Sequence, residues 1–199
     1  MIKLGITGGI ASGKTTASNY CKKNGAYIFN ADRKSKAHLK KSLSLQKKII
    51  NIFGNKIAPN NKINLNLLAL EAFKNQTNIE ILNGIMWPEV FLLINQEYNE
   101  IKSNQDYNFF IVDAALIFEA NYKNFFDKNI LITASEGIRL DRAIKRTNIN
   151  LENIQNRIAF QMPDKEKIKL ADYIINNNYT INNLYKKMDS IIAQIISAK

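Results

Sequence analysis

The chain has 199 residues, of which 46% are hydrophobic and 23% are charged, so it can bury a core and is not an intrinsically disordered protein. Its single cysteine, Cys21, excludes an internal disulfide and fits a reducing compartment. No signal peptide is recognised, and no segment has the roughly 18 consecutive apolar residues that a membrane span requires. We therefore expect one domain with an inserted sub-domain, located in the cytoplasm and without a membrane partner.

The formal net charge of +11 at pH 7 favours a phosphate-rich partner, such as nucleic acid, an anionic membrane or a small polyphosphate. A biased amino-acid composition explains the same charge without any partner. The lysines are scattered in pairs that begin at 22, 40, 47 and 186, and they form no basic block. No aromatic and basic module typical of RNA-binding domains is present. The scattered lysines favour the explanation by composition, and we expect no nucleic-acid partner.

The first predicted elements are a strand, a helix and a second strand. The apolar run Ile2–Thr7 ends at a glycine and indicates a buried strand. Lys14–Asn24 has a helical pattern, and Gly25 stands where the C-cap of that helix is expected. The segment Ala26–Asp32 predicts a second strand that ends in polar residues.

Helices are predicted from about residue 33 to residue 104. Thr77–Glu80 has the sequence of a capping box, which marks the start of a helix. Pro88 follows Trp87 and is expected to interrupt the pattern and open the next helix. Because this stretch is too long for a simple crossover, we expect a helical sub-domain over the strand ends, where ligands of such sheets bind.

Strands and helices alternate again in the second half of the chain. Strands are predicted at Phe109–Asp113, Lys128–Ala134 and Ala171–Asn177, and helices at about 135–147 and 180–198. The predicted strands are apolar on both faces. The pattern therefore indicates an α/β fold, in which helices cover both faces of a parallel sheet.

A phosphate-loop pattern, G-x-x-x-x-G-K-[ST], lies between the first predicted strand and the first predicted helix. Glycines allow successive backbone N–H groups to point at phosphate oxygens, and the helix N-terminus adds its positive dipole. Lys14 would reach the β- and γ-phosphates of ATP, and the Thr15 hydroxyl suits Mg²⁺. The predicted nucleotide-binding residues are Gly8, Gly9, Ile10, Ala11, Ser12, Gly13, Lys14, Thr15 and Thr16.

Switch GTPases, motor ATPases and small-molecule kinases all use a phosphate loop, so the loop does not name a reaction. The guanine motif N-K-x-D is absent, because the segment that begins at Asn55 lacks the aspartate, and no D-x-x-G switch motif occurs. A nucleic-acid-driven ATPase usually needs a larger chain. These observations favour a small-molecule kinase.

Two aspartates follow predicted strands. Asp32 could accept the proton of an acceptor hydroxyl during phosphoryl transfer, or it could cap a helix that starts at Arg33. Asp113 ends an apolar strand, as a magnesium-side aspartate would, but an ordinary polar residue at a strand end fits equally well. We retain Asp32 as a catalytic candidate and Thr15 with Asp113 as candidate metal ligands.

Arg139, Arg142 and Arg146 are spaced i, i+3 and i+7, so they share one face of a predicted helix. Such a face can bind phosphate oxygens and stabilise charge on a transferring phosphoryl group, or it can simply be solvated. Arg157 lies in a second polar helix, and the region of about 139–165 is typical of a lid that closes over ATP. We expect a surface position for His38, the only histidine.

The segment GITGGIASGKTTAS, followed by GAYIFNAD, resembles the dephospho-CoA kinase family, in which T-G-G-I-x-S-G-K-[ST] precedes a strand ending in D-A-D. The likeness continues through DAALIFEA, RLDRAIKR, RIAFQ and ADYIINN, and it covers nearly the whole chain in the right order. The resemblance implies a three-layer P-loop fold with a five-stranded parallel sheet in the order 2-3-1-4-5. It also implies that the enzyme transfers the γ-phosphoryl group of ATP to the ribose 3′-hydroxyl of dephospho-CoA, with Mg²⁺, in the last step of CoA synthesis.

Carried over position by position, the resemblance makes Asp32 the general base and places Arg142 and Arg146 in the lid. A helical insertion at about 35–104 would supply much of the pocket on the CoA side, and the lid would lie at about 139–165. The predicted catalytic residues are therefore Lys14, Asp32, Arg142 and Arg146. A monomer or a weak homo-oligomer is expected.

Four positions depart from the family pattern. Asn30 replaces the first aspartate of D-A-D, and an amide there can orient a neighbour but cannot act as a base. Trp87 stands where the family usually has histidine, Ala115 replaces a proline, and Ala11 replaces a common glycine. The acceptor therefore stays open between dephospho-CoA and a nucleoside, a nucleoside monophosphate or a sugar-like hydroxyl. A non-enzymatic nucleotide- or nucleic-acid-binding protein is the third alternative.

Overall fold

A computed structural model describes the backbone of residues 1–146 and 151–198, and the side chains of residues 1–145 and 154–198. The chain divides into two compact units, one formed by Met1–Asn30 with Tyr98–Lys199 and the other by Ala31–Glu97. Within the described ranges, no helix combines the length and the apolar character that crossing a membrane would need.

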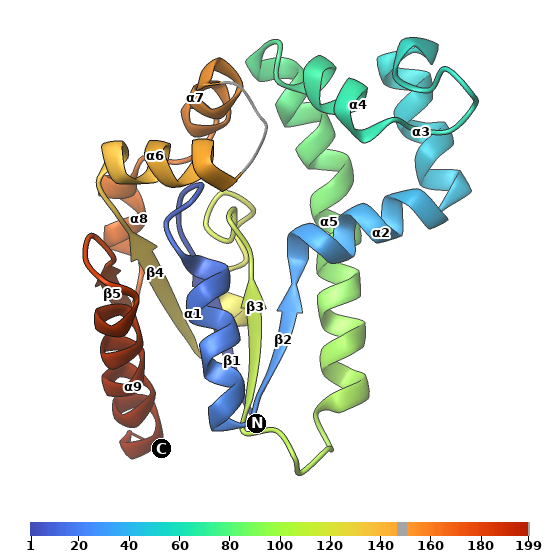
Figure 1. The fold of residues 1–199 in the computed structure, drawn as a ribbon. Coiled ribbons are helices and arrows are strands. Elements are labelled where there is room, and N and C mark those ends of the chain that lie inside the picture. The colour runs from blue at the N-terminus through green and yellow to red at the C-terminus, as the bar shows by residue number, and fades with distance from the viewer. Residues whose placement is uncertain (147–150, 199) are drawn as a thin grey trace. The chain divides into compact units, whose positions relative to one another are not determined.

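The first unit contains a five-stranded parallel sheet in the order β2-β3-β1-β4-β5 (Figure 1). This order and the all-parallel arrangement confirm the predicted fold class. All of β3 is buried, as expected for a strand with apolar side chains on both faces. The strands are β1 (Ile2–Thr7), β2 (Ala26–Asn30), β3 (Phe109–Asp113), β4 (Lys128–Thr133) and β5 (Tyr173–Asn176).

Helices cover both faces of this sheet. On one face, side chains of α1 and α9 pack against β1, β3 and β4 around buried residues such as Leu4, Ile111 and Met188. On the other face, Tyr98 at the end of α5 stacks edge-on against Phe110 and Phe125. The helices that lie wholly in this unit are α1 (Lys14–Tyr20), α6 (Glu136–Arg146), α7 (Leu151–Ala159), α8 (Asp164–Leu170) and α9 (Ile181–Ser197), with short 3-10 helices at Cys21–Asn24 and Lys123–Phe125.

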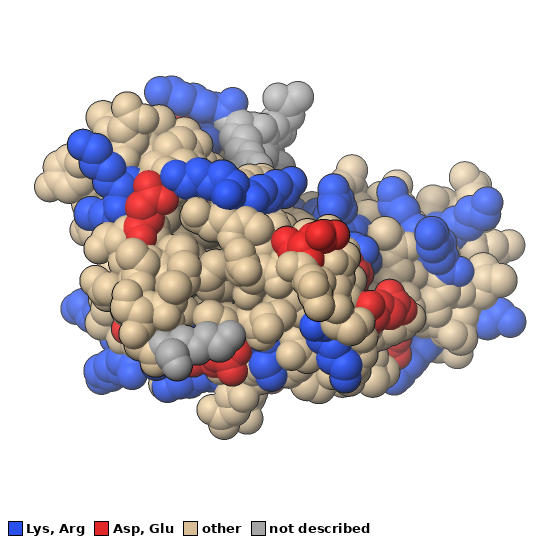
Figure 2. Space-filling view, turned by 90° about the horizontal axis from the view of Figure 1, so that it is seen from below, with Lys and Arg blue, Asp and Glu red and all other residues tan. Residues whose placement is uncertain are grey.

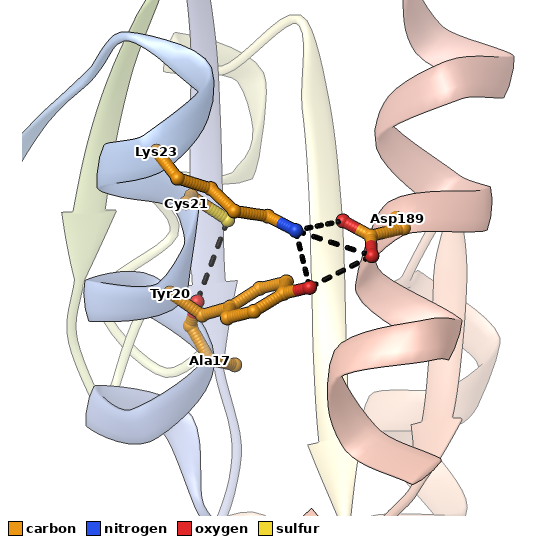
Figure 3. A network of polar contacts seen from close by, with 5 residues as sticks. All are labelled: Ala17, Tyr20, Cys21, Lys23 and Asp189. Atoms are coloured by element: carbon orange, nitrogen blue, oxygen red, sulfur yellow. Dashed lines mark hydrogen bonds and ion pairs between the residues drawn. The ribbon is translucent and has the colours of Figure 1, made fainter. Parts of the chain in front are cut away.

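The helix that follows the first strand is anchored to α9 by a polar network on the surface (Figure 3). The Tyr20 hydroxyl donates a hydrogen bond of 2.7 Å to Asp189 Oδ2, and Lys23 Nζ forms an ion pair of 3.0 Å with Asp189 Oδ1. Lys23 Nζ also donates to the Tyr20 hydroxyl. The Tyr20 ring stacks on Tyr185 at 3.9 Å between centroids. These contacts fix the end of α1 opposite its phosphate-loop end.

The second unit is helical and has its own apolar core. Leu39, Ile49, Leu68 and Ile85 are buried together, each contributed by a different helix. The unit contains α2 (Ala31–Lys41), α3 (Leu43–Phe53), a 3-10 helix at Asn55–Ile57, α4 (Leu65–Ala72) and most of α5 (Gln76–Ile101). The predicted insertion at about 35–104 overlaps this unit, and its role in substrate binding stays a prediction.

Two predicted boundaries near the N-terminus are corrected. The helix predicted over Lys14–Asn24 continues as an α-helix only to Tyr20, and Cys21–Asn24 forms a 3-10 helix. Its end at Gly25 is confirmed, because Gly25 has a φ of 70° in the left-handed C-cap region. The strand predicted over Ala26–Asp32 ends at Asn30, and Asp32 lies in the first turn of α2.

Two predictions within the second unit are wrong. The predicted capping box at Thr77 does not start a helix, because α5 begins at Gln76 and the Asn75 side chain accepts a 2.8 Å hydrogen bond from Asn78 N. Pro88 does not open a helix either, since α5 continues through it. A proline inside a helix removes the hydrogen bond to the carbonyl four positions earlier, which here belongs to Gly84.

Candidate nucleotide-binding site

The loop between β1 and α1 curls at the carboxyl end of the sheet. Its backbone is left-handed at Ala11 and Gly13, with φ values of 56° and 106°. Ser12 N donates to Gly9 O at 3.2 Å, and Ala17 N donates to Gly13 O at 3.0 Å as α1 begins. A side chain at Gly8 would overlap the Ile132 carbonyl of β4, which explains the glycine. The predicted strand, loop and helix are therefore all present in register.

Asn177 fixes the loop from the far end of β5. Its side-chain amide donates a 2.8 Å hydrogen bond to Ser12 O, and its backbone N donates to Thr133 O at 2.7 Å. Asn177 is buried, and a Cβ atom at Gly13 would overlap its amide. Sequence reasoning missed this contact, because Asn177 stood only as the last residue of a predicted strand. The hydrogen bond to Ser12 O thus ties the loop to the residue that follows β5.

Asp113, at the end of β3, meets the first turn of α1 and the end of β2 beside the loop. The Thr15 hydroxyl donates a 2.6 Å hydrogen bond to Asp113 Oδ2, and Asn30 Nδ2 donates a 3.0 Å hydrogen bond to the same oxygen. The register of the sheet produces this meeting, since Asn30 pairs with Asp113 across β2 and β3. Asp113 is 3% exposed. The two candidate metal ligands predicted from the sequence are therefore in direct contact.

A magnesium ion fits these groups. Mg²⁺ prefers oxygen ligands and usually combines one or two protein side chains with phosphate oxygens and water. The Thr15 hydroxyl and the Asp113 carboxylate supply such oxygens next to the phosphate loop. Within the part of the chain that the structure describes, no group of three or more His, Cys, Asp or Glu side chains gathers. An all-protein metal cage therefore has no support in these residues.

Arg139 of α6 lies against the loop and is largely shielded from solvent. Arg139 is 9% exposed, and its Nη2 atom lies 3.8 Å from Asp164 Oδ2. Arg142 Nη1 is buried and has no hydrogen-bond partner among the described residues. The alternative of a solvated basic face is therefore wrong for Arg139. Asp141 and Lys145 are exposed on the other side of the helix, as expected, and the side chain of Arg146 lies outside the described residues.

A family model described as dephospho-CoA kinase matches residues 2–183 of this chain. The chain belongs to the dephospho-CoA kinase family. The dephospho-CoA kinase of Fusobacterium nucleatum is 36% identical over 187 residues, which cover 94% of each protein. The dephospho-CoA kinase from Campylobacter jejuni has a solved structure with a TM-score of 0.67 and 27% identity, covering 97% of this chain and 96% of that one. The protein TT1252 from Thermus thermophilus, at 22% identity and a TM-score of 0.80 with 97% of both chains covered, shares the fold.

Three of the positions that depart from the pattern of dephospho-CoA kinases, Asn30, Ala115 and Ala11, lie in or near the nucleotide site. Asn30 keeps a hydrogen bond to Asp113, so the amide orients the neighbouring carboxylate. Ala115, which replaces a proline, offers its carbonyl to the Thr7 hydroxyl at 3.2 Å and to Lys167 Nζ at 3.2 Å. A proline would present the same carbonyl. Ala11 adopts a left-handed φ that a glycine would adopt at lower cost.

Asp32, the base that the dephospho-CoA kinase pattern implies, is the second residue of α2 and is exposed. It does not cap a helix that starts at Arg33, because α2 already begins at Ala31. It follows Asn30 by two residues, and Asn30 contacts Asp113. A carboxylate in the first turn of a helix is favoured by the helix dipole. Its catalytic role stays a prediction.

Glu119 and Lys167 form a second polar cluster that sequence reasoning missed. Lys167 is fully buried, and its Nζ atom lies 2.8 Å from Glu119 Oε1. Met162 N donates a 2.9 Å hydrogen bond to the same oxygen. Helix α8, which carries Lys167, was not predicted separately. These contacts join the segment after β3 to the chain around the end of the predicted lid. Lys167 therefore stabilises the fold through its ion pair with Glu119, a partner that the sequence alone does not indicate.

The other candidate reactive side chains in the described part of the chain are those of Cys21 and His38. Cys21 is buried, and burial, reinforced by the Asp189 charge, raises the pKa of its thiol to about 12, so it is a poor nucleophile. His38 lies in α2 with its Nε2 atom 2.9 Å from Glu89 Oε2, within the helical unit. Trp87 is partly buried in α5.

Proposed function

We propose that this protein is the dephospho-CoA kinase of its source, and that it transfers the γ-phosphoryl group of ATP to the ribose 3′-hydroxyl of dephospho-CoA, giving CoA and ADP. The reaction is the last step of CoA synthesis. The assignment of dephospho-CoA as the acceptor rests on one observation, the match to the dephospho-CoA kinase family over residues 2–183. The phosphate loop supports ATP as the donor, because its backbone and the start of α1 form an anion site.

In this proposal the loop binds the triphosphate before chemistry begins. Backbone N–H groups of residues 8–16 surround the phosphates, and Lys14 neutralises charge on the β- and γ-phosphates. Thr15 and Asp113 would hold Mg²⁺, which when bound neutralises charge on the phosphate oxygens. Asn30 keeps the Asp113 carboxylate in one orientation through its 3.0 Å hydrogen bond.

Phosphoryl transfer then needs an oriented hydroxyl and a stabilised phosphoryl group. The 3′-oxygen of dephospho-CoA attacks the γ-phosphorus, the bond to the β,γ-bridging oxygen breaks, and ADP leaves. Asp32 accepts the proton of the 3′-hydroxyl. Arg142 and Arg146 stabilise the charge on the moving phosphoryl group. The helical insertion at about 35–104 supplies the CoA-side pocket, and the lid at about 139–165 excludes water.

The proposal also covers the setting of the enzyme. It acts in the cytoplasm as a monomer or a weak homo-oligomer, without nucleic acid. On the face shown in Figure 2, Lys and Arg side chains form separate groups with acidic and uncharged surface between them. A scattered positive charge attracts a phosphate-rich substrate without specifying it.

An acceptor screen tests the proposed function. The purified protein is incubated with Mg-ATP and with dephospho-CoA, AMP, CMP, shikimate, gluconate or no acceptor, and ADP release is measured. ADP release that depends on dephospho-CoA supports the proposal. Release that depends only on another acceptor would assign a different small-molecule kinase, and salt-sensitive DNA binding without any transfer would assign a binding protein.

A further inference from the structure

Arg139 lies directly on the phosphate loop. The place that a Cβ atom of Gly9 would occupy overlaps the Arg139 guanidinium, and Gln161 Oε1 lies 3.7 Å from the same position. In Figure 1 the helix that carries Arg139, α6, crosses next to the loop between β1 and α1. A side chain at position 9 would therefore require the Arg139 guanidinium to shift.

The guanidinium is buried without the partners that burial usually requires. Arg139 is 9% exposed, and its Nε atom has no hydrogen-bond partner among the described residues. Its ion pair with Asp164 spans 3.8 Å, which is longer than the roughly 2.7–2.9 Å of a charge-assisted hydrogen bond. A buried cation with such loose pairing is costly unless an anion completes it.

An anion bound in the phosphate loop would supply the missing partner of the Arg139 guanidinium. The guanidinium lies against the backbone of this loop at Gly9, and both guanidinium groups and the backbone N–H groups of such a loop favour phosphate oxygens. We propose that Arg139 is a phosphate-binding residue of the nucleotide site, seated on Gly9, and that Asp164 competes with the nucleotide for it. This inference rests on ATP being the donor in the proposed function, but its test needs no acceptor.

The test measures the dissociation constants of ATP and of inorganic tripolyphosphate by titration calorimetry. Arg139→Gln should weaken both ligands by about 10-fold to 100-fold, the range of a hydrogen bond to a charged group. Lys145→Gln removes the same charge from an exposed position of the same helix and should change neither constant. Arg139→Lys keeps a cation and should bind both ligands with intermediate strength.

The Asp164→Asn variant distinguishes a phosphate-binding role of Arg139 from a purely structural ion pair between Arg139 and Asp164. It should leave ATP affinity unchanged or strengthen it, because it removes the competing carboxylate. Equal weakening of ATP by Asp164→Asn and Arg139→Gln, with equal losses of thermal stability, would overturn the proposal in favour of a structural ion pair. Weaker binding of ATP with unchanged binding of tripolyphosphate would also overturn it, since that result means contact with adenine.

A double-mutant cycle checks the contact with Gly9. Gly9→Ala should displace the guanidinium and weaken ATP binding in the wild-type background, but its cost should be smaller when Gln already replaces Arg139. Equal costs in the two backgrounds would contradict the contact. A wild-type protein that binds ATP, and an Arg139→Gln variant that binds it equally well, would reject this inference alone. A wild-type protein that transfers no phosphoryl group would reject the proposed function alone.

Discussion

At the residue scale, Asp113 shows how the ends of two strands and the start of a helix meet at one site. Its Oδ2 atom accepts hydrogen bonds from Thr15 on the phosphate loop and from Asn30 on the neighbouring strand. Asparagine at 30 is therefore compatible with the chemistry, because it supplies a donor to the carboxylate that we assign to Mg²⁺. A second aspartate there would instead need a shared proton or a cation between the two carboxylates.

Asp32→Asn tests the proposed base. We expect turnover with dephospho-CoA to fall by about 10²-fold or more, the scale of general-base assistance, with ATP affinity nearly unchanged. Asp106→Asn makes the same change at an exposed position and should leave turnover intact. Wild-type turnover by the Asp32→Asn variant would remove Asp32 from the catalytic residues.

Ala11→Gly tests the strain in the loop. Ala11 has a φ of 56°, in the left-handed region that disfavours residues with a side chain. Glycine should therefore raise the free energy of unfolding by up to about 1 kcal/mol, after its greater flexibility in the unfolded chain is subtracted. Urea unfolding measures this change. A less stable variant would mean that the alanine methyl group contributes packing that outweighs the strain.

At the element scale, the Glu119–Lys167 pair holds α8 against the segment that follows β3. Lys167→Met leaves Glu119 buried without its cation, and we expect it to lower the free energy of unfolding by about 3–5 kcal/mol. Lys165→Met, on the exposed side of the same helix, is the matched control and should cost little. Equal stability of the two variants in urea would show that the buried pair contributes no net stability.

The contact between α1 and α9 predicts a defined dependence on pH. The Tyr20 hydroxyl and then Lys23 lower the pKa of Asp189 below its ordinary value of 3.8, while Tyr20 and then Asp189 raise the pKa of Lys23 above 10.5. The stabilisation from Asp189 is present above pH 3.8 and is lost as the pH falls through its lower folded pKa. The stabilisation from Lys23 is present below pH 10.5 and is lost as the pH rises through its higher folded pKa.

The stability difference between the wild type and Asp189→Asn should therefore be constant between about pH 5 and pH 9 and should shrink in stronger acid. Thermal unfolding across this range measures it. Because both side chains are nearly half exposed, high salt should reduce the difference. A difference that changes steadily between pH 5 and pH 9 would mean that another group titrates with the pair.

At the scale of the whole molecule, the sheet could be predicted because its strands are short, apolar and separated by turn residues. The phosphate loop could be predicted because the motif G-x-x-x-x-G-K-[ST] between a strand and a helix is typical of a single loop conformation. The continuity of α5 through Pro88 could not, since a proline in a sequence usually marks a helix start or a break. Asn177, Glu119 and Lys167 could not either, because their roles depend on partners far away in the sequence.

Specificity for the acceptor substrate is a property of the whole molecule, and the proposed function depends on it. The central claim is tested most directly by the identity of the product formed from dephospho-CoA and Mg-ATP. Mass spectrometry and phosphorus NMR should find a product heavier by one phosphoryl group, with the new phosphate on the ribose 3′-oxygen and one ADP formed for each. Unchanged dephospho-CoA, together with phosphorylation of a different hydroxyl compound, would contradict the account.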